Sequence, residues 1–286
     1  MSHHSLLIVG CGDLGQRVSA LLDRTEWDIT GVRRHPPAGH ENINWVAADY
    51  SQAGSLDFAG QLRPDFVVTS FTPTSMDLEG YQRGFADAAD NVLRGLGEHR
   101  PKHLLMVSST RVYAESEGGW VDESSPLSTS DARAQAIIAA EQAFLSSPVP
   151  TSVIRFGGIY GDPHGRLMSK IARGQIAPAQ PVRYTNRIHR DDCAGFLVHL
   201  LQLSLAGTEL AAAYNGIDDD PAPAHEVESW IAATLGCVVN PAQQAGDVRV
   251  SGHKRCRNAL LRSTGYALRY PDYRSGYTEV CRHRQN

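Results

Sequence analysis

The chain has 286 residues, of which 42% are hydrophobic and 20% charged, and its formal net charge is −4 at pH 7. This length fits one large α/β domain or a nucleotide-binding domain with a smaller appendage, and the charge balance excludes any expectation of nucleic acid or an anionic membrane as partner. The five cysteines are scattered without a C-x-x-C pair, which disfavours a disulfide framework or a metal site and indicates reduced thiols in a cytoplasmic protein.

Neither a membrane span nor a signal peptide is expected. No apolar run approaches the roughly 18 residues that a spanning helix needs. The N-terminal segment also has no basic region ahead of its first apolar run, "SLLIVG", so it does not resemble a secretory leader.

Short apolar runs alternate with helical patterns through the first two thirds of the chain. We expect strands at 5–10, 27–32, 42–49, 65–71, 103–109 and 151–158, and helices near 79–98 and 130–146. Continuous Val, Ile and Leu runs separated by helices are typical of buried parallel strands. The pattern predicts an α/β fold with a doubly wound, mostly parallel sheet of the Rossmann type.

The alternation loosens after about residue 157. Residues 160–181 are predicted to form a loop around a short helix, followed by a helix near 191–204 and a strand containing 213–215. The segment 218–286 is expected to form a small α+β lobe. We therefore predict a nucleotide-binding Rossmann domain from 1–157 and 185–217, and an interleaved substrate-binding lobe from 158–184 and 218–286.

A glycine-rich turn follows the first predicted strand. In "GCGDLG", Gly10, Gly12 and Gly15 fit G-x-G-x-x-G at the opening of a helix. In a dinucleotide site these glycines permit the tight turn, the approach of the pyrophosphate and close helix–strand packing. The alternative is that they merely close a strand–helix turn. The residues that we assign to cofactor binding around this turn are Gly10, Gly12, Asp13, Leu14, Gly15 and, at the end of the fourth strand, Ser70.

The end of the second strand indicates which nucleotide is bound. Sites for NAD usually place a carboxylate there, to hold the ribose 2′-hydroxyl. This chain has Arg33 and Arg34 instead, and guanidinium groups suit a 2′-phosphate. We therefore predict NADP, with NAD left open, against the alternative of a solvated arginine pair. Asp49, at the end of the third strand, is predicted either to hydrogen-bond the adenine or to cap the next turn.

The chain resembles the extended short-chain dehydrogenase/reductase superfamily, in particular its epimerase/dehydratase-like branch. The segments that carry the resemblance, in family order, are "GCGDLG" (10–15), "SSTRVY" (108–113), "RFGGIYG" (155–161), "NRIHRDDCA" (186–194) and "YNGIDDDP" (214–221). It implies a sheet of about seven strands and a small C-terminal substrate lobe. Relatives often form homodimers, so a homodimer is one expected state.

The resemblance also implies roles for individual residues. Ser109 matches the family's catalytic Ser or Thr after the fifth strand. "RFGGIYG" resembles the loop that meets the nicotinamide, and it contains Tyr160. Arg187 and His189 match the segment that faces the substrate, and the two aspartates after them, Asp191 and Asp192, are expected to cap the following helix.

One part of the family pattern is missing. The family's catalytic Tyr and Lys form Y-x-x-x-K on the helix after the fifth strand, and here Arg133 and Ile137 align with those positions; none of the ten tyrosines has a lysine four residues later. A guanidinium does not release its proton in proteins. Tyr113, Tyr160 and His189 are the candidates for a replacement acid, each with a core or surface role as its alternative. We take Ser109 and Tyr113 as the candidate catalytic residues.

Three functional hypotheses follow. The first is an NADP-dependent oxidoreductase or epimerase that acts on a sugar nucleotide or a small carbonyl or hydroxyl compound with a non-standard acid. The second is a non-catalytic NADP-binding sensor. The third is an interaction module that has kept only the fold. The glycine turn and the arginine pair argue against the third.

Overall fold

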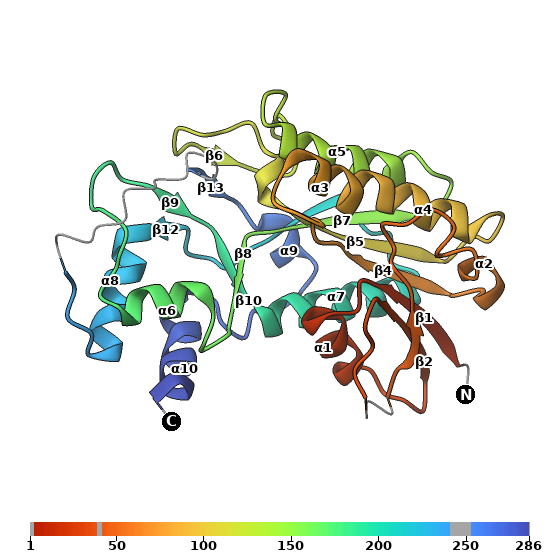
Figure 1. The fold of residues 1–286 in the computed structure, drawn as a ribbon, viewed down its shortest axis with the longest axis horizontal. Helices are drawn as coiled ribbons and strands as arrows, with labels where there is room; N and C mark the ends of the chain where they lie inside the picture. Colours follow the sequence, from red (N-terminus) through yellow and green to blue (C-terminus); the bar gives the residue numbers. More distant parts are fainter. Residues whose placement is uncertain (1–2, 39–41, 241–252, 286) are drawn as a thin grey trace. The chain divides into compact units, whose positions relative to one another are not determined.

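The computed structural model of the protein describes residues 3–38, 42–240 and 253–285. Its main sheet has seven strands in the order β11-β7-β5-β4-β1-β2-β3 (Figure 1). These strands are β1 (His4–Val9), β2 (Trp27–Arg33), β3 (Asn44–Ala47), β4 (Phe66–Ser70), β5 (His103–Ser109), β7 (Thr151–Phe156) and β11 (Ala213–Gly216). The pairs β1–β2, β1–β4, β2–β3 and β4–β5 are parallel. The predicted Rossmann-type fold with about seven strands is confirmed.

The apolar runs that predicted the strands form the core of this sheet. In β4 and β5 nearly every side chain is buried, because helices cover both faces of a parallel sheet. The fully buried apolar side chains of the three central strands are Leu6, Leu7, Ile8, Val9, Phe66, Val67, Val68, Leu104, Leu105 and Met106.

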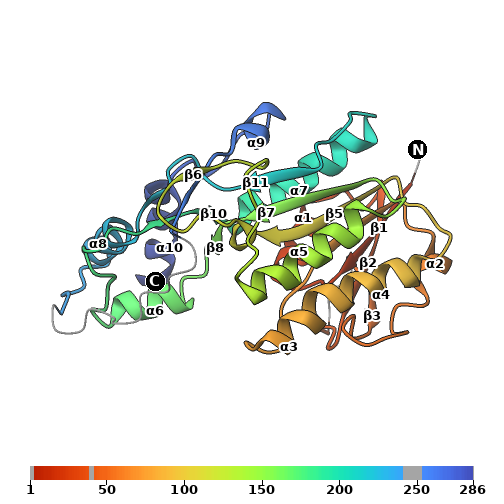
Figure 2. The ribbon, with the colours of Figure 1, turned by 90° about the horizontal axis from the view of Figure 1, so that it is seen from above.

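Helices α3, α4 and α5 lie along one face of the sheet (Figure 2). Helix α5 packs against α3, α4 and the turns η1 and η2. The helical elements are α1 (Asp13–Leu21), α2 (Ala59–Leu62), α3 (Leu78–Tyr81), the π-helical turn η1 (Gln82–Ala86), α4 (Asp87–Leu96), the 3₁₀ turn η2 (Thr110–Val112), α5 (Ala132–Leu145), α6 (Arg166–Ala172), α7 (Arg190–Leu205), α8 (Ala224–Leu235), α9 (Ala259–Ser263) and α10 (Tyr273–Gln285). In the part of the chain that the structure describes, no helix is both long and apolar enough to cross a membrane.

Two predicted elements differ from the structure in detail. The third strand covers only 44–47 and not 42–49, because Asp49 already belongs to a turn in which its carboxylate accepts hydrogen bonds from Ser51. The helix expected at 79–98 is three consecutive pieces, since η1 widens the helix by one π-helical turn between α3 and α4.

The chain divides into two compact units that alternate along the sequence. Unit 1 comprises 1–112, 127–155 and 194–214, and unit 2 comprises 113–126, 156–193 and 215–286. The short strands are β6 (Trp120–Val121), β8 (Gly158–Tyr160), β9 (Tyr184–Thr185), β10 (Arg187–His189), β12 (Ala222–Pro223) and β13 (Arg255–Cys256). They form three two-stranded pairs, β10–β8, β12–β9 and β13–β6. The predicted role of 158–184 and 218–286 in binding substrate stays a prediction.

Candidate functional site

The strand order places the glycine-rich turn at a switch point of the sheet. Strand β1 has β2 on one side and β4 on the other, so the chain leaves β1 where the strand order reverses. In open α/β sheets ligands bind at the carboxyl ends of the strands at such a point. Gly10 directly follows β1, and Ser70 ends the neighbouring strand β4.

Each glycine of the turn has a different physical reason to be glycine. Gly10 has φ +83°, and a Cβ there would overlap the carbonyl oxygen of Ser70. A Cβ on Gly15 would lie 2.9 Å from the Cys11 Sγ, inside the packing of helix against strand. Around Gly12, by contrast, the atom nearest to an added Cβ is the Gly10 carbonyl oxygen at 4.0 Å. The backbone at Gly12 is therefore open, as a phosphate cradle requires.

Helix α1 begins directly after this open position. Gly12 is its N-cap residue and brings no side chain to satisfy the first N–H groups, which leaves them for an anion. Asp13, at the first helical position, is exposed and forms an ion pair with Arg17 at 2.9 Å. Leu14 is half-buried beside it. Glycine geometry and helix start together fit the pyrophosphate of a dinucleotide.

The two arginines at the end of β2 carry unbalanced charge. Arg33 is the last, half-buried residue of the strand, and Arg34 is exposed. Neither forms an ion pair within 3–38, 42–240 and 253–285. The guanidinium of Arg33 is close enough to the glycine turn to oppose the effect of burial on Cys11, which raises the pKa of that thiol to about 12. Arg33 thus lies near the glycine turn, and the role of the pair in binding a nucleotide stays a prediction.

Asp49 takes the second of its two predicted roles in the structure. Its Oδ1 accepts hydrogen bonds from the backbone N–H and the hydroxyl of Ser51, at 3.1 and 2.7 Å. Contact with an adenine stays a prediction. The next residue, Tyr50, lies beside the glycine turn and was not predicted there: its Cε1 would lie 3.4 Å from a Cβ on Gly10, and its ring packs on Phe71 at 5.1 Å between centroids. Its position directly after Asp49 was the only indication in the sequence.

Ser109 and helix α5 lie in unit 1 with the glycine turn. Ser109 ends β5, is half-buried, and its Oγ accepts a hydrogen bond from the Arg111 N–H at 3.2 Å. At the positions aligned with the missing Tyr and Lys, the Arg133 guanidinium lies 5.7 Å from the centre of the Tyr81 ring, and Ile137 is buried at 2% exposure. An apolar core side chain therefore occupies the place of the activating cation.

A buried ion pair follows on the same helix. Glu141 accepts hydrogen bonds from Arg155 Nη2 at 2.7 Å and from the Ser108 hydroxyl at 2.5 Å. The side chains of Glu141 and Arg155 are only 1% and 5% exposed. This network fixes α5 to β5 and β7.

Tyr113 belongs to unit 2 and already has a hydrogen-bond partner. Its buried hydroxyl donates to Asn215 Oδ1 at 2.6 Å. The Asn215 amide in turn donates to the Arg257 carbonyl, and its backbone N–H donates to Glu123. These bonds favour a structural role for Tyr113, while its catalytic role stays a prediction.

The structure brings Tyr160, Arg187 and His189 together within unit 2. Strands β8 and β10 pair in parallel with His189 opposite Tyr160, and the two rings meet edge to face at 5.2 Å. The Tyr160 ring also stacks on Tyr277 at 4.3 Å. Its hydroxyl is buried without a hydrogen-bond partner among the described residues, and burial raises its pKa far above the usual range.

Arg187 is held by backbone carbonyls, not by a carboxylate. Its guanidinium donates to the carbonyl oxygens of Thr185, Asp220 and Ala222, at 3.1, 3.1 and 3.3 Å. It also bonds the Thr185 hydroxyl. The side chain is 5% exposed, so it stabilises the β9–β10–β12 region and has little bonding capacity left for a substrate.

A cavity of about 410 Å³ opens beside these residues in unit 2. Its walls are largely apolar, and most belong to β8, α6, β10 and α8. The residues that line it are Gly158, Ile159, Tyr160, Gly161, Asp162, Gly165, Arg166, Leu167, Met168, Thr185, Asn186, Arg187, Ala224, Val227, Glu228 and Tyr277. Glu228 is neutralised there by Lys170 at 2.9 Å. Volume and lining fit a small organic ligand.

Comparison with known proteins agrees with the nucleotide site. The model of the NAD(P)H-binding family matches residues 10–203, more than half of the chain. The chain belongs to this NAD(P)H-binding family. The structure of a putative NAD-dependent epimerase/dehydratase from Methylobacillus flagellatus has 31% sequence identity and a TM-score of 0.80, with 100% of each chain covered. Our protein is thus an epimerase/dehydratase-like member of the extended short-chain dehydrogenase/reductase superfamily.

More distant structures share the fold. A human epimerase family protein with NADPH has 19% identity, 97% and 99% coverage of the two chains and a TM-score of 0.75. The UDP-glucuronic acid 4-epimerase from Bacillus cereus, in complex with UDP-glucuronic acid and NAD, has 14% identity, 98% and 99% coverage and a TM-score of 0.81. No curated protein sequence matches the chain. A nicotinamide cofactor is therefore supported by both fold and family.

The expectation that Asp192 caps helix α7 is wrong. Asp192 is fully buried in the first turn of α7, and its carboxylate accepts hydrogen bonds from the backbone N–H groups of Arg269 and Tyr270, at 2.8 and 2.9 Å, and from the Tyr266 hydroxyl. A carboxylate that is removed from water needs several donors. Here a distant segment supplies them, so Asp192 anchors the 266–270 loop to the helix.

Asp218 is a second buried carboxyl group, and the sequence did not distinguish it. It has no exposed surface, its Oδ2 has no hydrogen-bond partner among the described residues, and its backbone N–H donates to the Arg187 carbonyl. Burial raises the pKa of Asp218 to about 8, and the charge of Arg187 only partly opposes the rise. The run "DDDP" offers no means of telling the buried aspartate from its more exposed neighbours.

This pKa predicts a specific loss of stability with rising pH. Folded protein keeps the Asp218 proton up to about pH 8, whereas an unfolded chain releases it near pH ~4. The stabilising contribution of protonated Asp218 is therefore complete below pH ~4 and is lost between pH ~4 and the folded pKa. Between pH 5.5 and pH 8.5, the free energy of unfolding measured with urea should fall less for Asp218→Asn than for wild type. An unchanged drop, equal to that of the exposed control Asp57→Asn, would contradict this prediction.

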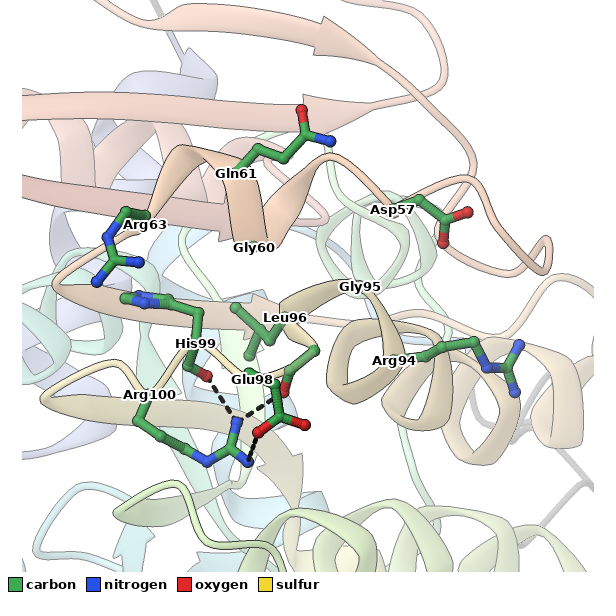
Figure 3. Close-up of a pocket in the computed structure, with 11 residues that line it drawn as sticks. Asp57, Gly60, Gln61, Arg63, Arg94, Gly95, Leu96, Glu98, His99 and Arg100 are labelled. Atoms are coloured by element: carbon green, nitrogen blue, oxygen red, sulfur yellow. Dashed lines mark hydrogen bonds and ion pairs between the residues drawn. The ribbon is translucent and has the colours of Figure 1, made fainter.

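A larger hollow in unit 1 is remote from the glycine turn. It has a volume of about 650 Å³ and lies beside α2 and the end of α4 (Figure 3). The chain leads from these helices into the first residues of β4 and β5, whereas Gly10 follows the last residue of β1. Two of its polar side chains bind backbone carbonyls: His99 contacts the Pro64 carbonyl at 2.8 Å, and Arg100 donates to the Gly97 carbonyl at 2.6 Å. The Arg94 side chain points away from it (Figure 3). We assign it no function.

Proposed function

We propose that the protein binds NADP at the glycine turn and acts as an oxidoreductase or epimerase. Its substrate would be a sugar nucleotide or a small carbonyl or hydroxyl compound. The observation that carries the proposal is the open backbone at Gly12, at the switch point of the sheet, combined with two arginines at the end of β2 that have no ion-pair partner among the described residues. The 2′-phosphate would bind Arg33 and Arg34.

Residues of each unit have a separate proposed role. The bound cofactor supplies or accepts a hydride. The Ser109 hydroxyl, at the carboxyl end of β5, orients the substrate oxygen. Within unit 2, substrate binding is proposed for the cavity that Tyr160 and Arg187 line, where the His189 ring meets Tyr160 edge to face. Of the three candidate acids, Tyr113 is the least favoured because its hydroxyl already donates to Asn215.

The cofactor preference predicts an asymmetric effect of the arginines. Wild type should bind NADPH more tightly than NADH by calorimetric titration. Arg33→Ala or Arg34→Ala should weaken NADPH binding about 10-fold or more, because a charge-assisted hydrogen bond contributes about 1.5–3 kcal/mol. The affinity for NADH should change little.

Arg94→Ala provides the control for that titration, since Arg94 is an exposed arginine of unit 1 and its replacement removes the same charge. It should leave both affinities within about twofold of wild type. If NADH binds as tightly as NADPH, or if the variants lose both nucleotides equally, the assignment of the 2′-phosphate to Arg33 and Arg34 fails. If neither nucleotide binds, the proposed function fails altogether.

A non-catalytic NADP sensor is the second candidate. It is favoured by Ile137, a buried core residue where relatives carry the lysine that activates the acid. The two functions differ in whether a substrate is converted. Oxidation of NADPH, followed at its absorbance with a panel of carbonyl compounds, supports the oxidoreductase, and conversion of a sugar nucleotide without net consumption of cofactor supports the epimerase. Tight binding of NADPH without either conversion supports the sensor.

A further inference from the structure

Two arginines gather at the site where the family's tyrosine is missing. Arg111, in η2, and Arg133, in the first turn of α5, both approach the ring of Tyr81, with guanidinium carbons 5.8 and 5.7 Å from its centre. Arg111 also belongs to the Ser109 turn, since its N–H donates to the Ser109 hydroxyl oxygen at 3.2 Å. All of these residues lie in unit 1. Arg111 thus links the Ser109 turn to the Tyr81 ring that Arg133 also contacts.

The carboxylate of Asp131 contacts both arginines but forms an ion pair with only one of them. Asp131, the N-cap residue of α5, binds Arg111 Nη2 with its Oδ2 at 2.7 Å. Its Oδ1 accepts the backbone N–H of Arg133 at 3.0 Å. The guanidinium of Arg133 has no carboxylate within ion-pair distance in the part of the chain that the structure describes. Two cations and one anion leave a net positive charge, to which the N-terminus of α5 adds.

The positive charge is also held in place. Contact of a guanidinium with an aromatic face restricts its rotation and leaves its edge free for hydrogen bonds. Tyr81 is itself immobilised: it is 8% exposed and stacks on Phe85 at 5.7 Å. Arg133 is half-exposed, so a ligand can reach it. A planar donor in a fixed position is suited to carboxylate or phosphate oxygens.

We infer that Arg133, positioned with Arg111 around Tyr81, binds an oxyanion on the substrate. The substrate class is then a small carbonyl or hydroxyl compound that carries a carboxylate or a phosphate. This inference rests on the proposed function, because it takes Ser109 to face the reacting group. It also gives Arg133 a purpose other than proton transfer, which its guanidinium cannot perform.

The test measures the binding of small ketones to protein saturated with NADP⁺. The oxidised cofactor cannot reduce the ketones, so binding is measured without reaction. The probes are pyruvate for the carboxylate, dihydroxyacetone phosphate for the phosphate, and dihydroxyacetone as the neutral ligand. By calorimetry, one anionic probe should bind about tenfold or more tightly than the neutral one. This preference should shrink with added salt, because the arginine is half-exposed. The anionic probe that binds identifies which oxyanion the substrate carries.

Three variants test whether Arg133 itself, and not positive charge in general, binds the anionic probe. Arg133→Gln should remove about tenfold or more of the affinity for the anionic probe, and Arg133→Lys should retain part of it. Arg94→Gln, at an exposed arginine with the same loss of charge, should change it by less than about twofold. NADP⁺ affinity, measured in all three, should equal that of wild type.

The outcomes distinguish failure of this inference from failure of the proposed function. If NADP⁺ binds but neither anionic probe binds better than dihydroxyacetone, the inference is overturned and the proposed cofactor site stands. The same holds if Arg133→Gln and Arg94→Gln have equal effects. If NADP⁺ does not bind to wild type, the proposed function and the inference that rests on it both fall.

Discussion

Replacing Glu141 with alanine is expected to destabilise the fold by about 3–5 kcal/mol, the cost of leaving a buried charge without its partner. Arg155 would keep its guanidinium at 5% exposure with its carboxylate partner removed, and the Ser108 hydroxyl would lose its acceptor. Because the pair joins α5 to β7 and, through Ser108, to β5, the loss acts on the centre of unit 1. Urea unfolding followed by circular dichroism measures it.

Two further variants show whether the ion pair itself is responsible. Glu79→Ala removes an exposed ion pair, Glu79–Arg83 at 3.5 Å, and should cost less than about 0.5 kcal/mol. The triple variant Ser108→Ala/Glu141→Leu/Arg155→Met replaces the buried network with apolar side chains and should recover most of the lost stability. A single Glu141→Ala variant as stable as Glu79→Ala would show that water reaches the network.

The central fold and the glycine turn were predictable from the sequence because both depend on local patterns. Strand β4, for example, is a continuous apolar run that ends at Ser70, and the turn after β1 has glycine at its three positions within six residues. Backbone constraints of this kind need only a few neighbouring residues, such as the positive φ of Gly10. The position of Arg33 at the end of β2 follows from the same local pattern, whereas the binding of a 2′-phosphate by Arg33 and Arg34 stays a prediction.

Contacts between distant segments were not predictable. The partner of Tyr113 is Asn215, and Asp192 binds the backbone at Arg269 and Tyr270. A local sequence pattern does not show that these segments meet. It therefore does not distinguish a tyrosine that could act as an acid from one whose hydroxyl makes a buried hydrogen bond. Asp218 illustrates the same limit, since burial and not residue type sets its pKa.

The structure shows what surrounds the two positions of α5 that lack the family's tyrosine and lysine. In sequence, Arg133 and Ile137 were only departures from the family pattern. In the structure, Ile137 is core and Arg133 shares a tyrosine ring with Arg111 beside the Ser109 turn. The family's acid and its activating cation have been replaced by a positively charged cluster at one position and by packing at the other. Under the proposed function, the charge of Arg133 would serve substrate recognition, since a guanidinium does not transfer its proton.

Gly12→Val is expected to abolish high-affinity NADPH binding while leaving the fold intact. The branched side chain would occupy the open space over the turn, where the nearest atom to a Cβ is 4.0 Å away, and would hold a pyrophosphate off the N-terminus of α1. The φ of Gly12, −86°, lies outside the left-handed region, and loss of a glycine N-cap costs about 1 kcal/mol or less. Calorimetry should show at least about a tenfold loss of affinity, with Gly12→Ala intermediate.

Gly10→Ala is expected to lower the stability of the fold, in contrast to Gly12→Val, which is expected to lower the affinity for NADPH. Its Cβ would overlap the Ser70 carbonyl at a φ of +83°, a conformation that costs an L residue about 1–2 kcal/mol before the overlap is counted. Thermal unfolding should therefore distinguish the two glycines, with a lowered midpoint for Gly10→Ala and a nearly unchanged one for Gly12→Val. Because Gly12 contributes nothing to packing, undiminished NADPH affinity in a folded Gly12→Val variant would mean that the nucleotide does not cross this turn, and the cofactor site would have to be placed elsewhere in the protein.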